Sequence, residues 1–385
     1  MLDTDRITAP LRRAAESGDI PGVAAAAATA DGVIFEAGFG TRDLATGAPM
    51  TADTVVWIAS MTKAVTGACA MQLVERGKLA LDADIARTVP ELAATKVLEG
   101  FDANGLPILR APRRPITLRH LLTHTSGFTY DMWNPDNARY LEATGTPGII
   151  TCRNAALTTP LASDPGERWE YGIGIDWAGK AVEAVSGQKL DRYMQENILG
   201  PLGMTDTGFR IGPAQRARLA KIHARTEDGL VSTDTELQQD QEFHMGGGGL
   251  YGTVGDYLKF TRMIMAGGTL GGTQILKPET VSMMWMNAMG DLTCRPMKTA
   301  NPALSNDVDF IDGWKWGLSW AINPQRLPTG RSAGSLAWAG LANSYYWIDP
   351  ARKVTGVYAA QLLPFFDAKA VAALEGFETA VYGSL

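Results

Sequence analysis

The pattern of apolar and polar residues near the N-terminus predicts a helix followed by a β-hairpin. Residues 5–17 favour a helix that Gly18 ends. Residues 23–30 and 33–40 are apolar-rich runs on either side of Asp31-Gly32, a dipeptide typical of a two-residue hairpin turn. We therefore expect this end of the chain to contribute a pair of antiparallel strands.

The C-terminal third contains a second set of strand-like segments, each bounded by turn residues. The predicted strands span residues 314–322, 332–338, 344–348 and 354–361, and a final helix is expected over residues 367–382. In the middle of the chain, loops rich in Pro and Gly separate short helices, and no convincing strand pair occurs. The helices expected there span residues 117–124, 174–185 and 190–199.

Strands at both ends around a helical middle predict an α+β fold, an α/β sandwich whose antiparallel sheet is built from both termini and flanked by helices. A chain of 385 residues is long enough for two domains. We expect residues 1–80 and 227–385 to form the α/β domain. Residues 81–226 would form a mainly helical second lobe, with the active site in the cleft between the two.

Composition excludes few classes of protein. With 45% hydrophobic and 20% charged residues the chain is ordinary for a globular protein, and its net charge of -6 without a basic cluster argues against a nucleic-acid partner. No run of about 20 strongly apolar residues predicts a membrane span, and residues 1–6 do not resemble a secretory signal. Cys69, Cys152 and Cys294 are scattered, which favours reduced thiols in a cytoplasmic protein; the mature chain of an exported protein would share these features.

Two serines compete as a candidate nucleophile. Gly330 to Gly334 fits the G-x-S-x-G pattern around Ser332, but that pattern needs a following helix and a histidine later in the chain. Here a strand-like segment follows, and His244 is the last histidine. We therefore interpret Ser332 as a chance match. The S-x-x-K pattern of residues 186–189 lies in an expected loop between helices and is discounted as well.

The stronger candidate is Ser60-Met61-Thr62-Lys63, at the start of a helix expected to end at Gly77. Residues three apart share a helix face, and the helix N-terminus favours a developing oxyanion. A lysine accepts the serine proton only when neutral, so its pKa must fall from about 10.4 towards 7 or 8. Lys63 lies in the apolar run 55–74, so we expect it to be buried, and burial would lower its pKa. The alternative is a helix-capping serine beside a solvated lysine.

Further motifs occur in a fixed order along the chain. They are Ser60 to Lys63, Leu121-Leu122-Thr123-His124-Thr125-Ser126-Gly127, Pro165-Gly166-Glu167 with Tyr171, Gly246 to Leu250, and Trp338-Ala339-Gly340. As an ordered set they resemble the serine β-lactamase-like superfamily, most closely the class C β-lactamases and the related family VIII carboxylesterases. The resemblance implies a β-lactamase/DD-peptidase-like fold.

The resemblance also implies residue roles. Ser60 would be the nucleophile, with Lys63 and Tyr171 sharing the proton transfer; whether Lys63 or Tyr171 is the general base stays open, because the two are expected to titrate as a coupled pair. The backbone N–H groups of Ser60 and Leu341 would form the oxyanion hole. The residues expected to contact substrate are Tyr130, Trp338 and Gly340.

Two departures from the lactamase pattern favour an ester substrate. Trp338-Ala339-Gly340 replaces K-T-G, and Tyr171-Gly172-Ile173 replaces Y-x-N. Both changes remove polar groups that would bind a β-lactam, and family VIII esterases commonly carry such a W-x-G. We therefore expect a carboxylesterase that hydrolyses small-molecule, short-chain esters through an acyl-enzyme on Ser60. The alternatives are a β-lactamase, a peptidase or amide hydrolase, an acyltransferase with the same chemistry, or a non-catalytic binding protein.

No metal or cofactor is expected. His120 and His124 have the i, i+4 spacing of a metal pair, but H-E-x-x-H is absent and no third ligand is evident. Gly246 to Gly249 lacks the Gly-Lys-Ser/Thr ending of a phosphate-binding loop, so tight packing behind the active site is the preferred interpretation.

Overall fold

An eight-stranded antiparallel sheet combines strands from both ends of the chain. This computed structural model describes residues 3–385, so Met1 and Leu2 of the predicted α/β domain lie outside the described residues. The strand order is β12 (Lys315–Trp316), β13 (Ala321–Ile322), β14 (Leu336–Gly340), β15 (Ser344–Asp349), β16 (Val354–Ala359), β1 (Gly22–Thr29), β2 (Val33–Asp43) and β3 (Ala48–Pro49). N-terminal β1 pairs with C-terminal β16, with Ala24 opposite Ala359. The predicted fold class is confirmed.

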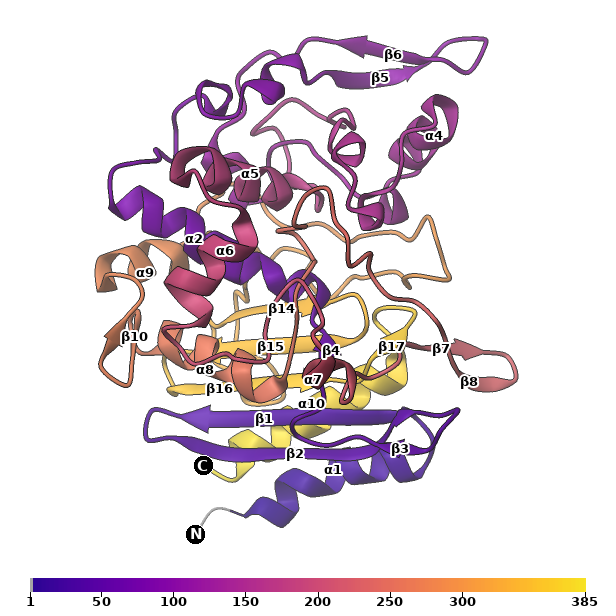
Figure 1. Cartoon of the computed structure of the whole chain (residues 1–385), viewed down its shortest axis with the longest axis vertical. Coiled ribbons are helices and arrows are strands. Elements are labelled where there is room, and N and C mark those ends of the chain that lie inside the picture. Colours follow the sequence, from indigo (N-terminus) through magenta and orange to yellow (C-terminus); the bar gives the residue numbers. More distant parts are fainter. Residues whose placement is uncertain (1–2) are drawn as a thin grey trace.

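Helices cover both faces of this sheet (Figure 1). On one face lie α1 (Thr4–Glu16) and α10 (Ala368–Gly383), where Phe377 contacts Phe35 and Trp347 of the sheet. On the other face lies α8 (Val254–Met265), and the turn that leads into α2 (Thr62–Glu75) contacts β14 and β15. Five successive alanines of β1, residues 24–28, are buried, because a strand covered on both faces has no polar side.

The helix α2 is buried almost all round, as expected of a helix that passes through the core rather than over it. It ends where expected, with Gly77 in a left-handed conformation. Its start differs from the prediction. Ser60 lies not in the helix but in a short 3-10 turn, Ala59–Met61, and α2 begins at Thr62.

The middle of the chain contains α3 (Leu118–Leu122), α4 (Pro135–Thr144), α5 (Gly174–Ser186) and α6 (Leu190–Met194), with α5 packed against α2. The expectation that this region lacks strand pairs was wrong, because β5 (Val97–Phe101) and β6 (Pro107–Arg110) form a hairpin. Apolar side chains of this hairpin, such as Ile108 and Leu109, are exposed, so no buried alternation marks it in the sequence. The division into domains at residues 80 and 226 stays a prediction.

Two of the predicted C-terminal strands are shorter than expected. Residues 314–322 form the hairpin β12–β13 instead of one strand, and Ser319 turns the chain with a φ of 90°. The next strand begins at Leu336, since residues 332–335 form a turn. Strand β14 therefore carries Trp338-Ala339-Gly340.

The remaining strands and α-helices are short. They are β4 (Val56–Trp57), β9 (Tyr251–Gly252), α7 (Pro213–Arg216), β7 (His223–Thr226), β8 (Gly229–Ser232), β10 (Thr269–Leu270), β11 (Thr273–Gln274), α9 (Pro278–Trp285) and β17 (Leu362–Leu363). No helix within residues 3–385 is long and apolar enough to cross a membrane. Each of the three cysteines is a buried free thiol.

Candidate active site

Ser60 lies on the 3-10 turn that precedes α2, directly above the end of β14. A Cβ on Gly340 would collide with the carbonyl of Ile58, so only glycine lets the strand pass beneath this turn. Ala59, immediately before the serine, has a φ of 46°, a left-handed conformation that costs energy for a residue other than glycine. The surrounding structure thus holds the Ser60 backbone in a strained, defined position.

Lys63 is completely buried, and its amine contacts three oxygen atoms. Nζ lies 2.9 Å from Ser60 Oγ, 3.0 Å from the Tyr130 hydroxyl and 2.6 Å from the Gly247 carbonyl oxygen. These three acceptors match the three N–H groups of an ammonium ion. Burial lowers the pKa of Lys63 from 10.5 to about 7, so the amine is close to losing its proton at neutral pH.

The two tyrosines of the site contact different partners. The Tyr171 hydroxyl accepts a 2.7 Å hydrogen bond from the indole N–H of Trp338, and the Lys63 amine lies 4.7 Å from the centre of the Tyr171 ring. Burial raises the pKa of Tyr171, while the nearby Ser60 hydroxyl and the hydrogen bond from Trp338 oppose that rise. Burial also raises the pKa of Tyr130 well above its usual value. Both phenols are therefore neutral at neutral pH.

The residues predicted from the sequence converge here. Leu341 lines the same small cavity as Ser60, with a volume of about 30 Å³. Tyr130 also lines this cavity, whereas Trp338 is buried behind it against Tyr171. Apart from these residues the cavity walls are mainly apolar, and include Trp57, Met132, Trp133, Ile149, Ile150 and Met245. The oxyanion-hole and substrate-binding roles stay predictions.

The sequence did not predict that Asp176 belongs to the site, or that the backbone of Gly247 bonds to both Asp176 and Lys63. The carboxylate of Asp176 accepts the Gly247 N–H at 2.8 Å, and the carbonyl of the same glycine accepts from Lys63. The one signal in the sequence is an acidic residue within the otherwise apolar stretch 173–178. The glycines pack tightly, as expected: a Cβ on Gly247 would lie 2.6 Å from an Asp176 oxygen.

The histidines and the serine that were discounted as metal ligands or nucleophile make packing or hydrogen-bond contacts instead. His124 packs against the rings of Trp169, Tyr171 and Trp316, and His120 completes a capping box at the start of α3. Ser332 lies in a turn, where its backbone N–H donates to Asp349.

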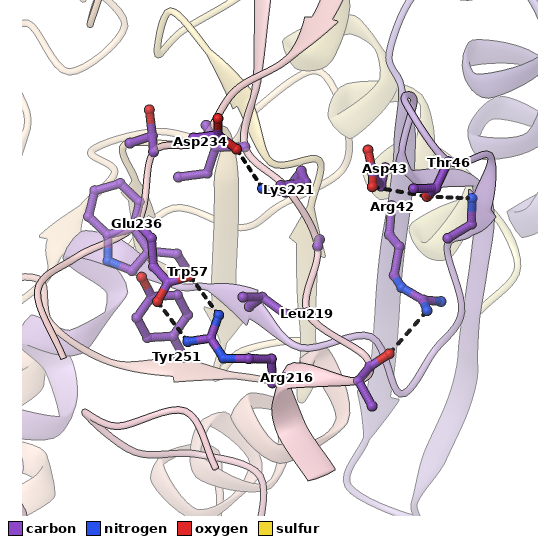
Figure 2. Close-up of a pocket in the computed structure, with 15 residues that line it drawn as sticks. Arg42, Asp43, Thr46, Trp57, Arg216, Leu219, Lys221, Asp234, Glu236 and Tyr251 are labelled. Atoms are coloured by element: carbon purple, nitrogen blue, oxygen red, sulfur yellow. Dashed lines mark hydrogen bonds and ion pairs between the residues drawn. The ribbon is translucent and has the colours of Figure 1, made fainter. Parts of the chain in front are cut away.

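A larger cavity of about 300 Å³ shares the side chain of Trp57 with the cavity at Ser60 (Figure 2). Its charged side chains all have bonding partners, either other charged groups or backbone and hydroxyl groups. Arg216 binds Glu236 with two hydrogen bonds, and Lys221 binds Asp234 at 2.8 Å. None of these charged side chains is fully buried, so the cavity lacks a group comparable to the buried amine of Lys63 at the Ser60 site.

The chain is similar to known proteins over most of its length. The family model described as Beta-lactamase matches residues 7–379. Over 394 residues the chain is 34% identical to monacolin J acid methylbutanoyltransferase of Aspergillus terreus, covering 96% of this chain and 94% of that protein. It is 32% identical over 364 residues to lovastatin esterase of Penicillium rubens, covering 90% of each. A variant of simvastatin synthase from Aspergillus terreus has a similar structure, with a TM-score of 0.85, 32% identity and coverage of 98% and 96%.

Proposed function

The chain belongs to the beta-lactamase family, within the serine β-lactamase-like superfamily, and from this premise we propose that it is an acyltransferase. It takes a short acyl group from an ester-type donor onto Ser60 and passes it to the hydroxyl group of an alcohol. The observation that carries the proposal is the buried Lys63 amine, 2.9 Å from Ser60 Oγ in an apolar cavity. Hydrolysis is the same reaction with water as the acceptor, so the esterase expected from the sequence becomes the second candidate.

Acylation begins with the Ser60 hydroxyl. Neutral Lys63 accepts its proton, and Ser60 Oγ forms a bond to the acyl carbonyl carbon. The bond from that carbon to the donor oxygen then breaks, and the departing alcohol takes a proton from the ammonium of Lys63 or from a tyrosine hydroxyl. The hydroxyl of Tyr130, 3.0 Å from the amine, and the hydroxyl of Tyr171, whose pKa the nearby Ser60 lowers, are the candidates for this proton transfer.

Deacylation repeats these steps with an acceptor hydroxyl in place of Ser60. The walls of the cavity are mainly apolar, with Met132, Ile149 and Met245 beside the nucleophile. Such walls hold a water molecule poorly, because a buried water needs two to four polar partners. An alcohol with an apolar body gains burial energy in the same place. These properties favour transfer to an alcohol over hydrolysis, and the methylbutanoyltransferase and the esterase among the relatives are consistent with both outcomes.

A β-lactam is a poorer substrate for this site. The indole N–H of Trp338, which replaces the lysine of K-T-G, is already bonded to Tyr171. Lys298, which begins a similar Lys-Thr pair, is exposed and bound to Asp307 at 2.7 Å. Neither residue offers a free cation to a substrate carboxylate at Ser60.

Mass mapping after fluorophosphonate treatment tests the nucleophile. We expect one adduct, on Ser60, that is absent in Ser60→Ala and retained in the control Ser332→Ala. The acceptor is tested with p-nitrophenyl butyrate in the presence of primary alcohols of increasing apolar size. An ester product that exceeds butyrate supports the transferase; butyrate alone, at all alcohol concentrations, supports the esterase. An unlabelled Ser60 with full activity would contradict both.

A further inference from the structure

Asp176 is a buried carboxylate in the first turn of α5, and its side chain points into the cluster around Lys63. It is 1% exposed. One oxygen, Oδ1, accepts the backbone N–H of Gly247, and the other, Oδ2, has no hydrogen-bond partner among the described residues. A buried carboxylate oxygen without a partner is costly, so its position calls for a compensating charge nearby.

That charge is the Lys63 amine, to which Asp176 is connected through one residue. The N–H of Gly247 donates to Asp176, while its carbonyl oxygen accepts from Lys63 at 2.6 Å. The preceding carbonyl, of Gly246, accepts from the hydroxyl of Thr66, which lies one turn further along α2. The two glycines are therefore held from two sides, by α5 through Asp176 and by α2 through Lys63 and Thr66.

We propose that Asp176 is a positioning residue for acyl transfer: through Gly247 it holds the Lys63 amine against Ser60 and Tyr130, and it supplies the buried negative charge that balances the ammonium form. The proposal rests on the proposed function, since it assigns a role within the same site. Asp176 touches neither substrate nor the reacting atoms, and acts only through Lys63.

The other titratable groups around this pair carry no charge at neutral pH. They are Tyr130 from the loop before α4, Tyr171 from the loop before α5, Cys152 from the loop after residues 149–151, and His124 after α3. Burial raises the pKa of the two phenols and the thiol, and lowers the pKa of His124. The electrostatic balance of Lys63 therefore depends on Asp176.

The two groups oppose each other's response to burial. Burial lowers the pKa of Lys63, whereas the negative charge of Asp176 raises that pKa. Conversely, burial raises the pKa of Asp176, whereas the positive charge of Lys63 lowers it. They titrate as a coupled pair. In Asp176→Asn the amide oxygen still accepts the Gly247 N–H, but the negative charge is gone, so burial acts on Lys63 unopposed.

The test is the pH profile of Ser60 acylation, measured by the single-turnover burst of p-nitrophenol. The part of this profile in which the rate changes with the protonation of Lys63 is called its Lys63 limb. In Asp176→Asn we expect the Lys63 limb to move to lower pH by about 1 to 3 units, because an opposite charge nearby usually shifts a pKa by that amount and the variant has lost it. The direction is the same whether neutral or charged Lys63 is the active form. The matched control is Asp256→Asn, a buried carboxylate on α8 that also accepts a backbone N–H, from Asp206. In this control the Lys63 limb of the pH profile should stay at the same pH as in the wild type.

Asp176→Glu separates charge from shape. It keeps the charge on a longer side chain, so the limb should stay near that of the wild type while the acylation rate falls. An unshifted limb in Asp176→Asn, or an equal shift in Asp256→Asn, would overturn the proposal. If Asp176→Asn does not fold, a shifted limb in Asp176→Glu overturns it and an unshifted limb supports it. Failure of the proposed function is recognised separately: Ser60→Ala would keep its burst if Ser60 were not the nucleophile, and added alcohols would give no ester product if the enzyme were an esterase.

Discussion

The indole N–H of Trp338 donates a 2.7 Å hydrogen bond to the hydroxyl oxygen of Tyr171. The ring centres of the two residues lie 4.9 Å apart, and Trp338 is buried. At the position where the lactamase pattern has a lysine, this chain therefore has a neutral donor that faces a tyrosine of the site. The substitution replaces a potential contact with substrate by a contact that favours the deprotonated form of Tyr171, which forms only when the phenol gives up its proton during the reaction.

Removing that donor should slow the reaction without removing the aromatic packing. We expect Trp338→Phe to lower kcat with p-nitrophenyl butyrate by about 10- to 100-fold, because hydrogen bonds to charged groups contribute about 1.5–3 kcal/mol. The control is Trp320→Phe, which loses a buried hydrogen bond to the Met284 carbonyl away from the site. It should reduce stability but leave kcat intact. Equal kcat values in Trp338→Phe and the wild type would show that the donor has no part in catalysis.

Lys63 should control the pH dependence of acylation. Its pKa is lowered to about 7, so the neutral amine dominates above that pH. If neutral Lys63 is the base, the single-turnover rate rises as pH increases through about 7. Arginine stays charged at all accessible pH values, so Lys63→Arg should lower the rate by about 10²- to 10⁴-fold. A wild-type rate that falls as pH rises through 7 would instead assign the base to a Tyr171 phenolate stabilised by charged Lys63.

The sequence was sufficient for those parts of the site that depend on local spacing. Ser60 and Lys63 are three residues apart, and their contact needs only the turn into α2. The family motifs also brought Tyr171, Trp338 and Leu341 to the same place. The sheet followed from strands at both ends of the chain, because each strand needs a neighbour for its backbone hydrogen bonds and the middle of the chain supplies none to this sheet.

What the sequence could not provide depends on contacts between distant segments. Tyr130 was expected to contact substrate, but its direct bond to Lys63, which joins residues 67 positions apart, was not predicted. Asp176 acts through the backbone of Gly247, and a backbone contact leaves no residue pattern to detect. The β5–β6 hairpin was missed for a different reason: its apolar residues face solvent, so burial did not shape their order.

The apolar wall at Ser60 should set the length of the acyl chain. Ile149 is buried and lines the 30 Å³ cavity, so Ile149→Ala creates room for a longer chain. We expect the ratio of kcat/KM for p-nitrophenyl hexanoate to that for butyrate to rise by about fourfold for each methylene group that becomes buried, at about 0.8 kcal/mol each. Ile198→Ala, buried outside this cavity, is the control and should leave the ratio unchanged. A ratio unchanged in both variants would place the acyl chain elsewhere.

His124 should make the protein less stable as pH falls below about 6.5. The ring is fully buried among aromatic side chains, and burial holds its pKa well below 6.5. Below pH 6.5 the unfolded chain therefore binds a proton that the folded chain does not, so the free energy of unfolding falls by about 1.4 kcal/mol per pH unit from this residue. The stabilising contribution is complete above pH 6.5 and is lost progressively on acidification.

His124→Asn isolates this contribution. Asparagine tolerates the φ of 57° at this position and offers an acceptor for the Gly172 N–H, but it does not titrate. At pH 7 the variant should be less stable than the wild type, because it loses packing against Trp169 and Trp316. Between pH 6.5 and 5 that difference should shrink by about 2 kcal/mol, as measured by urea unfolding. In the control Leu121→Ala, which removes a buried side chain without a titrating group, the difference should stay constant over the same range. A constant difference in His124→Asn as well would mean that the folded protein accepts the proton on His124 at no cost, contrary to the effect of its burial.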